Sequence, residues 1–328
     1  MNKRDLGRTG ADVSVLSMGG LFVSKVGGDR ASAIRAIHTA LDCGVTLVDT
    51  APGYYDSEEV VGLALRETSH PCMVSTKLGG RPTPFDARDP AALRSSFEAS
   101  LRLLGRDRID LLLIHEPDRP GQYDWWESRS PLRGPVLDLL LELKDRGLVQ
   151  WIGLGGTTAY ELPKLMESGL FDVVLTAFNY SLLWREAEIE VLPTAERLGM
   201  GVLAGSPLQQ GALARRYDQD VASGAPWLSS PRRRQYQELY RFVDEVGMSL
   251  PELAVRFVLS DARVSTLLMG ARNEAEVLAN VAAVELGPLP MPILERLRTI
   301  SDMVPFRPFE EPFGLPFTRT YRGPGRAT

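Results

Sequence analysis

The sequence predicts an α/β protein whose single domain, residues 1–328, folds as a (β/α)8 barrel, the TIM-barrel architecture. Short apolar segments alternate with longer amphipathic segments eight times along the chain, as strands alternate with helices in such a barrel. Several short segments are apolar throughout, which is typical of parallel strands covered on both faces. The length of 328 residues also suits a barrel of about 250 residues with additional loops. A doubly wound open sheet is the alternative fold.

We expect the barrel strands at apolar segments that are bounded by Gly, Pro or Asp. They are residues 13–18, 46–49, 73–77, 109–115, 149–154, 173–177, 202–205 and 266–270. The helix candidates between them have apolar residues at helical spacing and carry start and stop signals such as Pro90 and Gly105. They are residues 29–44, 56–65, 89–105, 134–147, 159–169, 185–199, 250–260 and 273–284. Asp56, followed three residues later by Glu59, resembles a capping box.

Four segments extend this regular pattern. Residues 3–13 suggest a small N-terminal β-hairpin, and the chain after about residue 304 is rich in Pro and aromatic residues, which suggests an irregular C-terminal arm. Residues 116–135 and 206–230 are too long for simple strand-to-helix connections. In a barrel these two loops would lie at the carboxyl-terminal rim, where active sites are found.

Composition and charge exclude several classes of function. A net charge of −5 without a basic block argues against nucleic-acid binding. No uninterrupted apolar run approaches ~18 residues, so we expect no membrane span. Cys43 and Cys72 lack the spacing of a metal site or redox motif, so we predict no bound metal and a reducing, cytoplasmic location. The sequence makes no prediction of the oligomeric state.

Polar residues stand at the ends of three consecutive predicted strands. Asp49, Lys77 and His115 end the second, third and fourth strands, and Tyr54 lies in the loop after the second. Each residue alone has an ordinary structural explanation, but the rim of a barrel would bring all four together. An ammonium lowers the pKa of a nearby phenol, which is otherwise near ~10, and an imidazole N–H polarises a carbonyl oxygen. Such a set protonates an oxygen that gains negative charge, and a hydride must then come from a cofactor.

The chain resembles the aldo-keto reductase family, whose members use nicotinamide nucleotides. The matching segments run in family order: LGRTGADVSVLSMGG, DTAPGYYDSEEVVGLAL, VSTKLG, IDLLLIHEPD, GLVQWIGLGG, GSPLQQGAL and MGARNEAEVLANV. The resemblance implies that Tyr54 is the general acid/base, that Lys77 lowers its pKa, that Asp49 anchors Lys77 and that His115 orients the carbonyl. The segment around Tyr54 looks closest to the bacterial sugar-dehydrogenase and aldehyde-reductase branch.

The same resemblance implies a set of cofactor-binding residues at the later strand ends. They are Asn179, Ser206, Leu208, Gly211, Gly270, Arg272, Glu276 and Asn280. Arg272 would meet a 2′-phosphate, which favours NADP(H), but the carboxylate of Glu276 would repel that phosphate, so NAD(H) is the alternative. Asn273 and Glu276 also form a capping-box pattern. Gly155 and Gly156 stand where the family commonly has Ser-Asn, which leaves Asn179 and Thr157 to hold the nicotinamide carboxamide. GLGGTT is not a Rossmann fingerprint, because Thr158 replaces the third Gly.

The expected substrate is a small molecule that meets aromatic residues at the rim. Phe22, Tyr123, Trp125 and Trp126 could line its pocket, although the last three could instead pack the long loop onto the barrel. The predicted reaction interconverts an aldehyde, ketone or aldose with its alcohol or lactone. One alternative is a nucleotide-binding regulatory module of the same fold, like the potassium-channel beta subunits. Another is a barrel isomerase or lyase that uses no nicotinamide.

Overall fold

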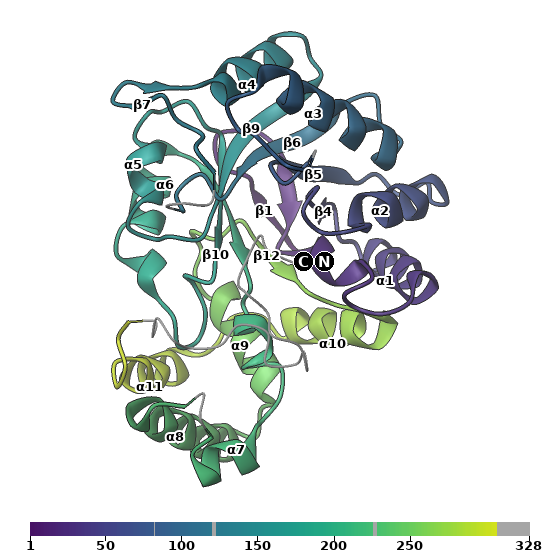
Figure 1. The fold of residues 1–328 in the computed structure, drawn as a ribbon. Coiled ribbons are helices and arrows are strands. Elements are labelled where there is room, and N and C mark those ends of the chain that lie inside the picture. The colour runs from purple at the N-terminus through teal and green to yellow at the C-terminus, as the bar shows by residue number, and fades with distance from the viewer. Residues whose placement is uncertain (82, 120–122, 226–227, 307–328) are drawn as a thin grey trace.

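The computed structural model describes residues 1–81, 83–119, 123–225 and 228–306, and its centre is a closed barrel of parallel strands (Figure 1). The strands follow one another around the barrel in the order β10-β11-β12-β3-β4-β5-β6-β9. Their bounds are β3 (Leu16–Gly19), β4 (Leu47–Asp49), β5 (Met73–Leu78), β6 (Ile109–His115), β9 (Val149–Gly156), β10 (Val173–Ala177), β11 (Gly201–Gly205) and β12 (Thr266–Met269). This closure confirms the predicted barrel and excludes the open sheet.

The first predicted strand is divided in the structure. Its beginning forms β2 (Asp12–Ser14), which pairs antiparallel with β1 (Lys3–Asp5) in the predicted hairpin, and only β3 joins the barrel. The Ser14 hydroxyl donates to the carbonyl of Leu16 at 2.6 Å, inside the bend between β2 and β3. The prediction of one strand over residues 13–18 was therefore wrong, because an apolar run does not reveal a change of strand partner.

Helices surround the barrel, and three more lie beyond this ring (Figure 1). The surrounding helices are α1 (Arg30–Asp42), α2 (Ser57–Arg66), α3 (Pro90–Leu104), α4 (Pro135–Asp145), α5 (Leu162–Met166), α6 (Val191–Leu198), α9 (Leu250–Leu259) and α10 (Glu274–Glu285). The others are α7 (Asp218–Ser223), α8 (Ser230–Val246) and α11 (Met291–Ser301), and α8 packs on α9 and α11. Within the described parts of the chain, no helix has the length and apolar character needed to cross a membrane.

Two local predictions need correction. Asp56 precedes α2, but its side chain does not cap that helix, because the carboxylate accepts the backbone N–H of Lys25 at 2.8 Å instead. The long loops also contain regular elements that are too short for a periodic pattern. Residues 116–135 include a hairpin of β7 (Ser128–Arg129) and β8 (Leu132–Arg133), and residues 206–230 include η3 (Gln209–Gly211) and α7. The predicted C-terminal arm lies almost entirely in residues 307–328, outside the described residues.

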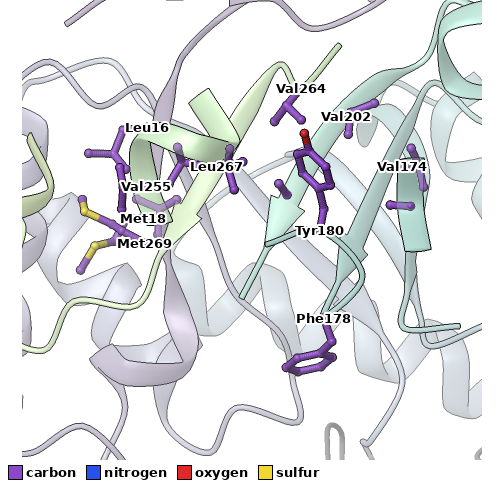
Figure 2. Packing of buried hydrophobic residues seen from close by; sticks show 14 of the residues in the cluster. Leu16, Met18, Val174, Phe178, Tyr180, Val202, Val255, Val264, Leu267 and Met269 are labelled. Atoms are coloured by element: carbon purple, nitrogen blue, oxygen red, sulfur yellow. The ribbon is translucent and has the colours of Figure 1, made fainter. Parts of the chain in front are cut away.

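Alternate residues along the strands fill two separate apolar clusters. In β6, Leu111 and Leu113 belong to the small cluster inside the barrel, whereas Leu112 and Ile114 belong to the large cluster between the strands and the helices. Figure 2 shows part of the large cluster. Leu6 and Val13 of the hairpin region join the inner cluster. Apolar side chains thus fill both faces of the strands. The polar residues Asp49 and His115 stand where strands end, at the carboxyl-terminal rim.

Candidate active site

The four expected catalytic residues come together at the carboxyl ends of neighbouring strands. Asp49 is the last residue of β4, Lys77 lies near the end of β5, and His115 is the last residue of β6. Tyr54 follows β4 in the turn that leads to α2. Its ring lies 5.7 Å from the His115 ring in an edge-to-face arrangement, and the Lys77 ammonium lies 4.9 Å from the Tyr54 ring centroid.

Lys77 and Asp49 form a buried ion pair in this site. The Lys77 Nζ donates to Asp49 Oδ1 at 2.9 Å and to Oδ2 at 2.7 Å, and it also donates to the carbonyl of Thr50 at 2.7 Å. Ser75 adds a hydroxyl donor to Asp49 at 2.7 Å. The two charged side chains are only 1% and 3% exposed. Burial lowers the pKa of Lys77, and the carboxylate of Asp49 opposes that shift.

The surroundings of Tyr54 keep its phenol protonated. Burial raises the pKa of Tyr54 well above its usual value, and the negative charges of Asp49 and Glu116 raise it further. This direction is opposite to the expected lowering by Lys77. Burial is the largest cause of this direction, and the sequence order of the four residues does not reveal how deeply the phenol is buried.

His115 is a neutral hydrogen-bonding group at this rim. Burial lowers the pKa of its imidazole to about 3, and the nearby charge of Lys77 acts in the same direction. Two glycines border it closely. A Cβ on Gly53 would lie 3.7 Å from the His115 ring, and one on Gly79 would lie 3.1 Å from the His115 Cβ and 3.2 Å from Trp125. Because the pKa of the imidazole is about 3, the ring is neutral at pH 7, keeps one N–H and can donate it to an oxygen.

Two buried carboxyl groups directly after His115 were missed from the sequence. Glu116 is buried with a left-handed backbone, φ 52°, and burial raises the pKa of its carboxyl to about 7. Asp118 is fully buried and accepts backbone N–H groups from Thr157 and Thr158. The one sequence signal was the presence of two acids immediately after a strongly apolar strand.

The expected cofactor residues lie on a second arc of the same rim, after β10, β11 and β12. Asn179 is buried after β10, and its Nδ2 donates to Thr176 Oγ1 at 3.1 Å. Ser206, Leu208 and Gly211 lie in the loop after β11, and Gly270 begins the loop after β12. In the order of the barrel, β3 separates this arc from the catalytic strands on one side and β9 on the other.

The loop after β11 suits a polar ligand. Ser206, Gln209 and Gln210 are non-glycine residues with left-handed φ values of 58°, 47° and 54°. Gln209 is 2% exposed, and neither atom of its side-chain amide has a hydrogen-bond partner among the described residues. Strained backbone and an unsatisfied buried amide are costly in a folded protein, and they are most often kept at functional sites. The residues at this arc thus fit a nucleotide with polar and charged groups.

The residues after β12 are engaged with one another. Asn273 caps α10 by accepting the N–H of Glu276 at 3.0 Å. Glu276 accepts the backbone N–H of Arg272 at 2.9 Å and pairs with its guanidinium, including Nε at 2.9 Å. In a capping box the Glu276 carboxylate would accept the backbone N–H of Asn273. Here it accepts the N–H of Arg272, one residue earlier, so only the Asn273 half of the expected capping box is formed. Asn280 donates to the carbonyl of Glu276 at 2.7 Å.

The four expected substrate residues do not form one wall: two residues of the long loop are buried, one is partly buried, and one lies on the cofactor arc. Trp125 and Trp126 are buried, and Trp126 Nε1 donates to the carbonyl of Pro117 at 3.0 Å, so both pack the long loop onto the barrel. Tyr123 is partly buried against Trp125 at 5.4 Å between ring centroids, and a Cβ on Gly80 would lie 3.5 Å from its hydroxyl. Phe22 lies against Gly270, on the cofactor arc, where a Cβ on Gly270 would be 2.8 Å from the Phe22 ring.

Two further observations concern metal ligands and cavities. In the described ranges, no group of three or more His, Cys, Asp or Glu residues could hold a metal ion. A cavity of about 610 Å³ lies outside the barrel and is lined by residues such as Tyr180, Arg185 and Arg298. None of the four rim residues lines that cavity, so its size does not make it the active site.

The fold and the rim define a class of barrel proteins with a buried ion pair, a tyrosine and a neutral histidine at the carboxyl ends of neighbouring strands. Comparison with known families then narrows this class. A model of the aldo/keto reductase family matches residues 16–302, and the chain belongs to that family. The match covers every strand of the barrel and all the rim residues described above.

Individual relatives have diverse names. A protein named NADH-specific methylglyoxal reductase, from Escherichia coli (strain K12), is 29% identical, and the match covers 87% of this chain and 94% of that protein. Pyridoxal 4-dehydrogenase from Microbacterium luteolum is 30% identical, with 85% and 92% covered. A probable voltage-gated potassium channel subunit beta from Arabidopsis thaliana is 27% identical, with 94% and 99% covered.

Proposed function

We propose that the protein is an oxidoreductase that interconverts a small aldehyde, ketone or aldose with its alcohol or lactone, using a nicotinamide nucleotide. The buried Lys77–Asp49 pair beside Tyr54 carries this proposal. A buried ion pair is a costly way to stabilise a fold, so its retention at the rim is best explained by chemistry. Family membership supports the same reaction class.

The residues divide the work as follows. A nicotinamide nucleotide held by the residues after β10, β11 and β12 would supply the hydride that reduces the carbonyl. The neutral imidazole of His115 donates an N–H to the carbonyl oxygen and orients it. Tyr54 gives its phenolic proton to that oxygen as negative charge develops there. Lys77, held by Asp49, stabilises the phenolate that remains until the solvent returns a proton.

The raised pKa of Tyr54 also suggests a preferred direction. A phenol that stays protonated at neutral pH is ready to act as an acid, which carbonyl reduction requires. Alcohol oxidation instead requires the phenolate, which burial and the neighbouring carboxylates disfavour. We therefore propose that reduction is the faster direction near neutral pH.

Replacing the proposed acid tests this assignment directly. Tyr54→Phe removes only the hydroxyl, so we expect carbonyl reduction to fall by about 100-fold or more. Binding of the reduced nucleotide, followed by fluorescence, should stay unchanged because Tyr54 does not hold the nucleotide in this proposal. A Tyr54→Phe enzyme with near-normal turnover would contradict the mechanism.

The choice between the two nucleotides depends on Arg272. The sequence favoured NADP(H), with Arg272 on the 2′-phosphate, and that assignment has not been tested. The ion pair with Glu276 opposes it, because a 2′-phosphate would have to displace the carboxylate and lie beside its negative charge. The described contacts therefore shift our proposal towards NAD(H).

A pair of titrations decides this point. We expect NADH to bind at least as tightly as NADPH to the unmodified protein, measured at equal ionic strength by fluorescence quenching. A strong preference for NADPH would restore the assignment of Arg272 to the 2′-phosphate.

The regulatory alternative is weaker than the enzymatic proposal. Three relatives are named as probable or putative potassium channel subunits beta. The chain nevertheless retains the buried ion pair and the neutral histidine, which nucleotide binding alone does not require. Steady-state oxidation of the nucleotide with a panel of aldehydes and sugars separates the two functions, since a regulatory module would bind the nucleotide without turnover.

A further inference from the structure

Asp118 joins two loops of the rim that are distant in sequence. Its carboxylate is fully buried and accepts the backbone N–H of Thr157 at 3.2 Å and 2.9 Å and that of Thr158 at 2.6 Å. Asp118 lies three residues after His115, and the two threonines directly follow β9. One side chain thus holds the backbone of the loop after β9 from the segment that follows β6.

The same carboxylate explains why residue 156, just before the two threonines, is glycine. A Cβ on Gly156 would lie 2.6 Å from Asp118 Oδ2 and 2.6 Å from Leu162. Separations under 3.0 Å leave no room for a side chain, so the carboxylate fills the space that a side chain at position 156 would need. The residue at position 156 must be glycine for Asp118 to reach the two N–H groups.

The loop that Asp118 holds forms part of the active-site wall. Gly155 lies directly opposite His115 in the pairing of β6 with β9, and its carbonyl accepts the N–H of Glu116 at 2.7 Å. A Cβ on Gly155 would lie 3.7 Å from Cε of Lys77. A shift of the loop by a fraction of an ångström would therefore move Thr157 relative to both His115 and Lys77.

We propose that Asp118 is a positioning residue, which fixes the loop of Gly155–Thr158 so that Thr157 meets the nicotinamide end of the bound nucleotide. This inference rests on the proposed function, because it assumes that a nicotinamide lies at this wall. It also explains how a chain with two glycines at this point presents an ordered loop to its cofactor.

The charge of Asp118 makes the anchor dependent on pH. Burial raises the pKa of its carboxyl to about 6, while the N–H groups of Thr158 and Thr157 oppose the rise. Glu161, at the start of α5, adds to the rise and is itself paired with Arg129 and Lys164. On the segment of Asp118, Glu116 is paired with Arg119. The carboxylate therefore accepts both N–H groups fully above about pH 7 and loses strength as the pH falls below 6.

The test replaces one carboxylate oxygen of Asp118 and keeps the shape of the side chain. Asp118→Asn removes the negative charge and puts an NH₂ group, which cannot accept a backbone N–H, in place of one oxygen, so the hydrogen bonds to Thr157 and Thr158 weaken. We expect NADH to bind about tenfold more weakly, whereas ADP-ribose, which lacks the nicotinamide, binds within twofold of the unmodified protein. We expect the unmodified protein to bind NADH more weakly as the pH falls below 6, and the variant should lack the part of that pH dependence that comes from Asp118.

Asp172 provides a matched control, because its carboxylate holds the backbone of β9 far from the rim. It precedes β10, is buried, and accepts the backbone N–H of Ile152 in β9 at 3.0 Å, away from the rim. Asp172→Asn should lower the melting temperature and leave the affinities for both ligands unchanged. Gly156→Ala gives a second perturbation of the anchor, because the new Cβ displaces the carboxylate, and it should weaken NADH binding selectively as well.

The possible outcomes separate this inference from the proposed function. Equal weakening of NADH and ADP-ribose in both rim variants, or none in either, would overturn the positioning role while the proposed function stands. If Asp118→Asn does not fold, Gly156→Ala and the pH dependence of the unmodified protein decide. No binding of NADH or NADPH to the unmodified protein would overturn both proposals.

Discussion

The protein has a lysine–aspartate pair at each end of its barrel, and the two pairs behave as different kinds of interaction. At the carboxyl rim, Lys77 lies 2.7 Å from Asp49, with exposed fractions of 1% and 3%. At the amino end, Lys144 lies 2.6 Å from Asp172, with exposed fractions of 37% and 13%. The distances are nearly the same, so geometry does not distinguish the pairs.

The two pairs differ in how far their side chains are exposed to water. Water screens a partly exposed pair, which contributes little to stability. Two charges removed from water cost free energy unless each is fully bonded, and Lys77 accordingly uses three donor contacts while Asp49 accepts a hydroxyl as well. The comparison teaches that the same pair of residues can serve as a partly exposed contact at one end and as a source of fixed charge at the other.

Removing each lysine should produce the largest contrast between the two ends. Lys77→Met leaves the Asp49 carboxylate buried without its cation, so we expect a loss of about 3–5 kcal/mol of unfolding free energy and a fall in turnover of about 100-fold or more. Lys144→Met should cost about 1 kcal/mol or less and leave kcat unchanged. Denaturant unfolding and steady-state kinetics measure both. Equal effects on kcat at the two ends would refute the contrast.

A smaller effect should come from Glu116, which contributes to the electrostatics of the rim. Its ionised carboxylate raises the pKa of Tyr54, so Glu116→Gln should lower that pKa and move the alkaline limb of the reductive kcat profile to lower pH. Asp124→Asn on the same loop is the control, since that side chain is 81% exposed. A limb that stays in place or moves to higher pH would contradict this coupling.

The same residue gives a check on stability. The pKa of Glu116 is raised from 4.5 to about 7 in the folded protein, so the folded state binds more protons than the unfolded state between these values. The contribution of Glu116 to the unfolding free energy is therefore favourable at low pH and is lost as the pH rises from about 4.5 to 7. Glu116→Gln should remove this dependence in unfolding experiments across that range.

The sequence predicted those features that depend on order along the chain. The barrel follows from repeated apolar and amphipathic segments, and the meeting of Asp49, Lys77 and His115 follows because neighbouring strands end at one rim. Features that depend on packing were not accessible. The direction of the Tyr54 pKa shift depends first on burial and then on the charges of Asp49 and Glu116, and no spacing of residues encodes burial.

Contacts between distant segments account for the other differences. Asp118 meets Thr157 across 39 residues, so its role could not be found from local motifs. Trp125 and Trp126 had two explanations from sequence, and their burial, which favours packing of the loop, could not be found from local motifs. Asp56 has the residue pattern of a helix cap, but its carboxylate instead accepts the backbone N–H of Lys25, which is distant in the sequence.

The hairpin of β1 and β2 has a practical consequence. Leu6 and Val13 fill the amino mouth of the barrel, and a Cβ on Gly7 would lie 2.2 Å from the backbone nitrogen of Gly201, so this mouth is stoppered by main chain as well as by side chains. Among the described residues, this packing closes the amino mouth of the barrel, so we expect a small molecule to approach from the carboxyl-terminal rim. A tether attached at Met1 would therefore fix the protein to a support with its working face towards the solution.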